Sequence, residues 1–182
     1  MLSKILEKYS KHGTNTVYLS YFDSPLGKLI AAADKSFLYF VLFEDSKDLE
    51  KKLQTLNEEM KCTFVEDKND ILMKLDTELT EYFKGNIKEF TIPLKTNGTD
   101  FQKDVWKKLL EVPYGSTNTY GDLAKLLGRP ASHARAVGSA CGANSHILLI
   151  PCHRLVSTAS KGGFSCGIDR KEWLLKHEKK FA

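Results

Sequence analysis

The spacing of the apolar residues most constrains the fold. Residues 16–43 contain short runs rich in aromatic and aliphatic residues, separated by turn residues such as 23–27, a pattern typical of an antiparallel β-meander. From residue 47 onward, apolar residues recur mostly every three or four positions, which predicts helices. We place a domain boundary at the polar, glycine-containing segment 95–99, and we predict one domain over residues 1–96 and a second over residues 97–182.

The first domain is predicted to contain a β-sheet accompanied by helices. The expected strands are residues 16–22, 28–33, 37–43 and 61–65, and the expected helices are residues 47–56 and 71–83. Gly85 should end the second helix, because glycine readily adopts the left-handed conformation found just beyond helix ends. We assign the apolar positions of these segments to the core.

The second domain is predicted to be mostly helical. Residues 100–111 should form its first helix, with Thr99 or Asp100 at the N-cap. The spacing of the apolar residues predicts a buried face made of Phe101, Val105, Leu109 and Leu110.

Two short helices that follow resemble a helix-turn-helix. Thr119 can cap the first, over residues 120–127, and Ser132 can cap the second, which should end near Ala143. Nearly all side chains of the second helix are small, and only Arg135 is long enough to reach base edges. Such a surface suits close approach to the minor groove of DNA with little sequence choice. The alternative is a helix packed tightly in a core.

The charge of the chain is unevenly distributed. Residues 1–96 hold 14 Lys and Arg against 16 Asp and Glu, whereas residues 97–182 hold 13 against 7. The second half therefore has a net charge of +6 and the first half one of −2, which together give the +4 of the chain. A basic second domain fits a surface that faces DNA phosphates, and it fits an ordinary solvated face equally well.

Several classes of protein are disfavoured by what the sequence lacks. No apolar run approaches the ~20 residues needed to span a bilayer, and the N-terminal residues do not resemble a secretory signal. Cys62, Cys141, Cys152 and Cys166 form no Cys-x-x-Cys pair, which argues against a zinc site or a disulfide framework. We therefore expect a soluble, intracellular protein with no metal or cofactor.

A candidate nucleophile follows the apolar segment 147–150, which we predict to be a strand. This segment leads into Cys152 and His153, and a cysteine at the end of a buried strand beside a histidine can act as a nucleophile. The alternative is an inert buried cysteine. Adjacent residues of an extended chain point to opposite sides, so the chain must turn here or a water must carry the proton. Glu172 or Glu178, on a predicted C-terminal helix, could orient the histidine.

The segment Ile150-Pro151-Cys152-His153-Arg154 resembles the active-site signature of the O6-alkylguanine-DNA alkyltransferases. Further segments fit the same family in the same order, namely 24–27, 81–85, 101–106, 113–115, 119–121, 123–124, 128–130, 134–138, 144 and 171–175. The resemblance therefore covers most of the chain and is densest after residue 100.

This resemblance implies a fold and an activity. The fold would be a ribonuclease-H-like β-sheet domain with helices, followed by a mostly helical, winged-helix-like domain with the helix-turn-helix. The activity would be DNA repair, in which an alkyl group moves from O6-alkylguanine, and also from O4-alkylthymine, to the protein's own cysteine once per molecule. The implied partner is double-stranded DNA, bound through its minor groove by a monomer. The implied location is the cytoplasm, or the nucleus in a eukaryote.

The resemblance also implies roles for individual residues. Cys152 would accept the alkyl group, and His153 would act as general base through a water. The pattern Leu-x-x-His-Glu selects Glu178 as the carboxylate that orients His153. Asn144 would brace the turn that holds Cys152, and Tyr120 would push on the target phosphate and donate a hydrogen bond to guanine N3.

Other implied roles concern the DNA and the base pocket. Arg135 would fill the gap left by the flipped nucleotide, on a helix face formed by Ala134, Gly138 and Ser139. In the base pocket, the backbone carbonyls of Cys152 and Leu155 would accept hydrogen bonds from the exocyclic amine of guanine, and Ser165 would contact the O6 atom. Phe164 and Cys166 would also line the pocket. They belong to the loop 157–167, in which Gly162 and Gly163 permit a flexible wall.

Two features depart from the family pattern. The turn 130–135 is one residue longer than usual, which affects the aim of Arg135. Cys166 stands where the family usually has glycine, and we expect it to narrow the pocket, so that benzyl lesions react more poorly than methyl lesions. Its proximity to Cys152 in such a pocket would also permit an oxidative disulfide.

Two other functions compete with alkyl transfer. A cysteine hydrolase could use Cys152 and His153, but it would turn over and would need no DNA. A non-catalytic lesion binder could share the fold, but such relatives lack the cysteine that is present here.

Overall fold

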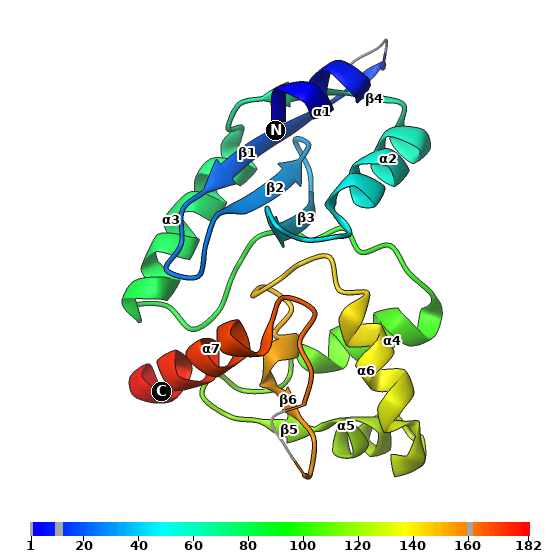
Figure 1. Ribbon diagram of the computed structural model, residues 1–182, viewed down its shortest axis with the longest axis vertical. Helices are drawn as coiled ribbons and strands as arrows, with labels where there is room; N and C mark the ends of the chain where they lie inside the picture. Colours follow the sequence, from blue (N-terminus) through cyan, green and yellow to red (C-terminus); the bar gives the residue numbers. More distant parts are fainter. Residues whose placement is uncertain (1, 10–12, 160–161) are drawn as a thin grey trace. The chain divides into compact units, whose positions relative to one another are not determined.

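The computed structural model describes residues 2–9, 13–159 and 162–182, and its chain divides into two compact units (Figure 1). The first unit extends to Thr80 and includes Thr91–Lys95, and the second comprises Glu81–Phe90 and Thr96–Ala182. Residues 81–90 therefore group with the second unit, whereas the sequence assigned them to the first. Part of the expected pocket loop, residues 160–161, lies outside the described residues.

The first unit is built on a four-stranded sheet in the order β3-β2-β1-β4. Its strands are β1 (Asn15–Phe22), β2 (Leu29–Ala33), β3 (Leu38–Phe43) and β4 (Cys62–Glu66). The predicted antiparallel meander is confirmed, because β2 pairs with both β1 and β3 in antiparallel register. β4 joins the other side of β1 in parallel, which requires a crossover connection rather than a hairpin.

The helices of the first unit follow the predicted positions closely. They are α1 (Leu2–Tyr9), α2 (Leu49–Met60) and α3 (Asp70–Lys84), although the last turn of α3 belongs to the second unit. α2 continues four residues beyond its predicted end and stops at Lys61, whose φ of 45° is left-handed. Leu72, Leu75 and Leu79 of α3 are buried at the spacing that the sequence indicated.

The second unit is mostly helical, as predicted. Its elements are α4 (Asp100–Leu109), β5 (Asn118–Thr119), α5 (Tyr120–Leu126), η1 (Ala131–His133), α6 (Ala134–Gly142), η2 (Cys152–Arg154), β6 (Leu155–Val156) and α7 (Ile168–Phe181). The two-residue strands β5 and β6 pair in parallel. No helix in the described part of the chain has the length and apolar character needed to cross a membrane.

The first helix of this unit, α4, has a well-defined start and a face that differs from the prediction. Thr99 caps it in a capping box with Gln102. Leu110 was predicted to be buried, but it is the C-cap residue of α4 and is 55% exposed. Trp106 is buried instead, and its indole Nε1 donates to the Ala140 carbonyl at 2.8 Å. This bond joins α4 to α6.

The helix-turn-helix consists of α5 and α6. Thr119 caps α5 by accepting a hydrogen bond from the Asp122 amide at 3.0 Å, as predicted. Ser132 does not cap α6, contrary to the prediction, since it lies within the 3₁₀ turn η1. The N-cap of α6 is His133, which makes no side-chain capping bond.

Candidate active site

The segment before the candidate nucleophile is a buried turn rather than the predicted strand. Residues 147–150 are all buried, but the Ile150 amide bonds back to the His146 carbonyl at 2.9 Å and Leu148 has a φ of 73°. Asn144 closes this turn from within, because its Oδ1 accepts from the His146 amide at 2.8 Å and its Nδ2 donates to the Ile150 carbonyl at 2.9 Å. An apolar run can therefore be buried without pairing in a sheet.

Cys152 begins the short 3₁₀ helix η2, where its side chain is 3% exposed. The Asn144 amide Nδ2 lies 3.3 Å from Sγ, so the residue that closes the turn also contacts the sulfur. Burial raises the pKa of the Cys152 thiol to about 11, while the Asn144 hydrogen bond and the Lys171 charge act in the opposite direction. At neutral pH the thiol is therefore protonated, and it needs a base to react as a thiolate.

His153 is fully buried and lies against Glu178, not against Glu172. Its Nε2 is 2.7 Å from Glu178 Oε1. An ionised carboxylate can only accept hydrogen bonds, so we place the ring proton on Nε2 and a free lone pair on Nδ1. Nδ1 is buried and has no hydrogen-bond partner among the described residues. Burial lowers the pKa of His153 despite the nearby carboxylate, which keeps the imidazole neutral.

Glu178 is held by several donors besides His153. Arg154 binds both carboxylate oxygens, with Nε 2.9 Å from Oε2 and Nη2 3.0 Å from Oε1. The Tyr82 hydroxyl donates to Oε1 at 2.8 Å, and the Gly115 amide donates to Oε2 at 3.4 Å. Burial acts to raise the pKa of Glu178, but the hydrogen bonds and charges of His153 and Arg154 outweigh it and hold the pKa well below its usual range. The carboxylate is therefore ionised at all physiological pH values.

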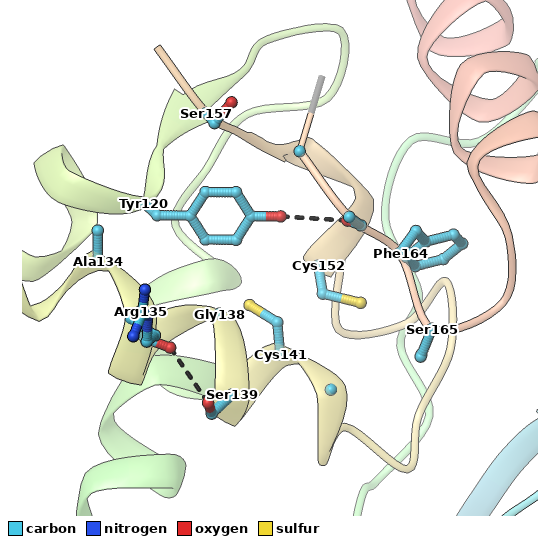
Figure 2. Close-up of a pocket in the computed structure, with 13 residues that line it drawn as sticks. Tyr120, Ala134, Arg135, Gly138, Ser139, Cys141, Cys152, Ser157, Phe164 and Ser165 are labelled. Carbon is cyan, nitrogen blue, oxygen red and sulfur yellow. Dashed lines mark hydrogen bonds between the residues drawn. The ribbon is translucent and has the colours of Figure 1, made fainter. Parts of the chain in front are cut away.

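A cavity of about 600 Å³ opens in front of Cys152 (Figure 2). It is lined by Tyr120, Ala134, Arg135, Gly138, Ser139, Cys141, Gly142, Cys152, Ser157, Gly162, Gly163, Phe164 and Ser165. Its volume lies within the range of small-molecule sites, which is sufficient for one nucleobase with a substituent. Figure 2 shows the sulfur of Cys152 directed into the space between α6 and the loop that carries Phe164.

The cavity wall agrees with the predicted pocket only in part. Phe164 and Ser165 line it, as expected. Leu155 has no exposed surface, and Cys166 is not among the residues that line the cavity, although it lies close enough to Cys152 to help raise the pKa of that thiol. The expectation that Cys166 narrows the pocket stays a prediction. All four cysteines are free thiols, including Cys166. Cys141 contributes a second sulfur to the wall, a position for which the sequence offered no chemical motif.

Tyr120 lies at the mouth of the cavity, and Lys171 donates a hydrogen bond to its hydroxyl. From the sequence, Lys171 was assigned no role in the site. The Tyr120 hydroxyl lies 3.2 Å from the Gly163 carbonyl, to which it donates. Lys171 Nζ donates to the Tyr120 hydroxyl at 3.3 Å, to the Gly163 carbonyl at 3.0 Å, and to the Leu155 carbonyl, which was predicted to face the guanine amine. Burial raises the pKa of Tyr120 to about 12, so its hydroxyl keeps its proton and remains a donor.

The small residues of α6 and its single long cation lie beside this cavity. Ala134, Gly138 and Ser139 are all part of the wall, and Arg135 extends from an exposed position. The Ser139 hydroxyl donates to the Arg135 carbonyl at 3.2 Å, a bond within α6 that does not involve the guanidinium (Figure 2). The predicted DNA-contacting residues therefore share one surface with the candidate nucleophile.

Together, the helix-turn-helix and the cysteine site define a DNA-binding protein with a buried nucleophile. The family model described as "6-O-methylguanine DNA methyltransferase, DNA binding domain" matches residues 100–180, and the model described as "6-O-methylguanine DNA methyltransferase, ribonuclease-like domain" matches residues 17–96. The chain belongs to this family. Its activity is that of the family, the transfer of a methyl group from methylated DNA to a protein cysteine, and the predicted fold class is confirmed.

Individual relatives cover nearly the whole chain. The methylated-DNA--protein-cysteine methyltransferase of Methanosarcina acetivorans is 39% identical over 163 residues, which are 89% of this chain and 98% of the relative. The crystal structure of Mycobacterium tuberculosis O6-methylguanine methyltransferase superposes with a TM-score of 0.77 at 36% identity, over 91% of this chain and 94% of that one. A further crystal structure, of the M. tuberculosis protein in complex with DNA, has a TM-score of 0.77 at 34% identity over the same shares.

Proposed function

We propose that this chain repairs duplex DNA by moving an alkyl group from the O6 atom of guanine to Sγ of Cys152, once per molecule. The observation that carries this proposal is the arrangement around the sulfur. Cys152 lines a cavity of nucleobase size, and the next residue, His153, is paired with Glu178 through Nε2 and has Nδ1 free to accept a proton. No metal or cofactor takes part in the proposed reaction.

The reaction can be written with all protons and electron pairs assigned. A water carries the proton of the Cys152 thiol to Nδ1 of His153, and Glu178 stabilises the resulting imidazolium. The thiolate attacks the alkyl carbon in line with the bond to O6, a carbon–sulfur bond forms, and the electron pair of the broken carbon–oxygen bond passes into the guanine ring. The Tyr120 hydroxyl turns its proton from the Gly163 carbonyl to N3, where negative charge develops. The guanine anion then takes up one proton from water, and the His153 imidazolium returns one proton to water, so the products are the thioether, neutral guanine and neutral His153.

The product explains why each molecule acts once. Cys152 becomes a thioether, and no side chain described around the cavity can break a carbon–sulfur bond. An O4-alkylated thymine presents the same kind of alkyl–oxygen bond, and we include it as a second substrate.

We propose that the base reaches Cys152 by rotating out of the duplex. The small side chains of α6 allow a close approach to the minor groove with little sequence preference, and Arg135 can occupy the space that the flipped nucleotide leaves. The crystal structure of the M. tuberculosis relative with DNA supports a DNA partner for this chain. We propose that the protein acts as a monomer, in the cytoplasm or, in a eukaryote, in the nucleus.

A mass measurement tests this proposal directly. After incubation with a duplex that contains O6-methylguanine, the peptide carrying Cys152 should gain one methyl group, in an amount that never exceeds one per protein molecule. The variant Cys152→Ser should show no gain. Continued product formation beyond one equivalent would identify a hydrolase, and an unshifted mass with tight binding would identify a lesion binder.

A further inference from the structure

Tyr82, in the last turn of α3, lies deep in the second unit, although it belongs to a helix that begins in the first. It is 1% exposed, and its ring packs against those of Phe90, Tyr114 and His177. Its backbone carbonyl accepts from His177 Nε2 at 2.8 Å. The side chain is therefore fixed on all sides, and its only polar atom is directed at Glu178.

The oxygen of Glu178 that Tyr82 contacts is the one that orients the general base. Oε1 lies 2.8 Å from the Tyr82 hydroxyl, 2.7 Å from His153 Nε2 and 3.0 Å from Arg154 Nη2. A carboxylate oxygen has about two lone-pair sites, so the three donors share its electron density. Each donor therefore weakens the attraction that the others experience, and the phenol competes with the imidazole.

We propose that Tyr82 is a positioning residue for alkyl transfer, whose hydroxyl fixes the Glu178 carboxylate and limits how strongly it draws a proton onto His153. The proposal rests on the function proposed above, in which neutral His153 accepts the thiol proton. Tyr82 touches neither substrate nor sulfur, and acts through Glu178 alone.

The sign of the effect follows from the electrostatics. Without the phenol, Oε1 keeps more of its negative charge for His153, so the protonated imidazole becomes more stable. A protonated His153 cannot accept the proton of the Cys152 thiol, and transfer then requires a higher pH. The charged and titratable groups around His153 are Glu178 and Lys171 from α7, Arg154 and Cys152 from η2, Tyr82 from α3, and Tyr114 from the segment before β5. Of these groups, Tyr82→Phe removes only the Tyr82 hydroxyl, which donates to Glu178, and the control Tyr114→Phe removes only the Tyr114 hydroxyl, which does not.

The test compares two tyrosines whose hydroxyl oxygens are buried. Tyr82→Phe removes the hydroxyl that bonds to Glu178, whereas Tyr114→Phe removes a buried hydroxyl that has no hydrogen-bond partner among the described residues. Single-turnover methyl transfer is measured from about pH 5 to about pH 9, together with the melting temperature. Tyr82→Phe should move the acid limb upward by ~0.5–1 pH unit, which slows transfer ~3–10-fold on that limb and little at alkaline pH. Tyr114→Phe should keep the profile of the unmodified protein.

A second replacement reverses the sign and keeps the packing. 3-Fluorotyrosine placed at position 82 is a more acidic phenol and a stronger donor, so it should move the acid limb to lower pH. The role of Tyr82 would be overturned if the pH profiles of methyl transfer coincided for all three proteins, namely the unmodified protein, Tyr82→Phe and the fluorinated protein. This holds whatever happens to the melting temperature. Failure of the unmodified protein to methylate Cys152 would instead overturn the proposed function, and this proposal with it.

Discussion

Lys171 is the residue whose environment is hardest to explain by packing alone. Its ammonium is buried, and among the described residues no carboxylate lies within ion-pair distance of it. Oxygens of Tyr120, Leu155 and Gly163 satisfy its donors. Burial lowers the pKa of Lys171, and the sulfur of Cys152 acts in the opposite direction. Burying the Lys171 charge costs free energy, and a thiolate nearby lowers that cost more than a neutral thiol does. The buried ammonium therefore favours ionisation of Cys152.

The variant Lys171→Met tests this reasoning. Without the cation, the Cys152 thiolate and the departing guanine both lose a favourable charge interaction, so we expect methyl transfer to slow by about tenfold or more. The three oxygens also lose their donor, which should cost ~1–3 kcal/mol of folding stability. Single-turnover rates and the pH dependence of iodoacetamide labelling measure the two effects on the sulfur. A labelling profile identical to that of the unmodified protein would contradict the electrostatic role.

Glu178 is expected to contribute to stability as well as to chemistry. The variant Glu178→Gln leaves the buried Arg154 guanidinium without its carboxylate, which should destabilise the protein by ~3–5 kcal/mol. The pKa of Glu178 is lowered in the folded protein, so its contribution is complete above its unfolded pKa of ~4.3 and is lost as the pH falls toward the folded value.

Thermal unfolding over a range of pH checks this dependence. The gap in melting temperature between the unmodified protein and Glu178→Gln should be constant above about pH 5 and should narrow below about pH 4. A gap that stays constant down to about pH 3 would show that the carboxylate is not the group responsible.

At the scale of elements, spacing predicted the strands and most helices because each exposes one face and buries the other. The same reasoning failed at residues 147–150, where a side chain rather than a neighbouring strand satisfies the backbone. The only sign of this turn in the sequence was Asn144, which lies six residues before Ile150 and donates to its carbonyl. An asparagine can make many different local hydrogen bonds, so its presence alone does not predict the turn. Tyr82 was correctly placed in a core, but its partner Glu178 lies 96 positions later in the chain, beyond any local pattern.

The pocket loop offers a test at this scale. Gly162 has a φ of 75°, and a Cβ there would lie 2.8–2.9 Å from ring and hydroxyl atoms of Tyr120. Gly162→Ala should therefore strain the loop and displace the phenol from the cavity mouth, slowing methyl transfer ~10-fold or more. At Gly163 nothing lies within 4 Å of a Cβ, so Gly163→Ala should retain much more activity. Equal rates for the two variants in single-turnover assays would contradict the proposed position of Tyr120.

At the scale of the whole molecule, the positive charge lies in the half that carries the helix-turn-helix. Residues 97–182 hold 13 Lys and Arg against 7 Asp and Glu, while residues 1–96 are slightly acidic. Contacts between cationic side chains and phosphates release counterions, so they weaken as salt concentration rises. Chemistry on a free base that diffuses into the cavity needs none of these contacts. The two substrates therefore separate the DNA-binding surface from the reactive site.

We expect salt to affect the duplex and the free base differently. Repair of subsaturating duplex should slow ~10-fold or more between about 50 mM and about 200 mM salt, whereas alkylation of Cys152 by free O6-benzylguanine should hardly change. Arg135→Ala should slow duplex repair ~10-fold or more at either salt concentration, because the flipped nucleotide loses the side chain that replaces it in the stack, and should leave the free-base reaction intact. Lys35→Ala, in the acidic first half, is the control for loss of one positive charge. If Arg135→Ala impaired both substrates equally, the residue would act on the reaction at Cys152, and α6 would not be the element that opens the duplex.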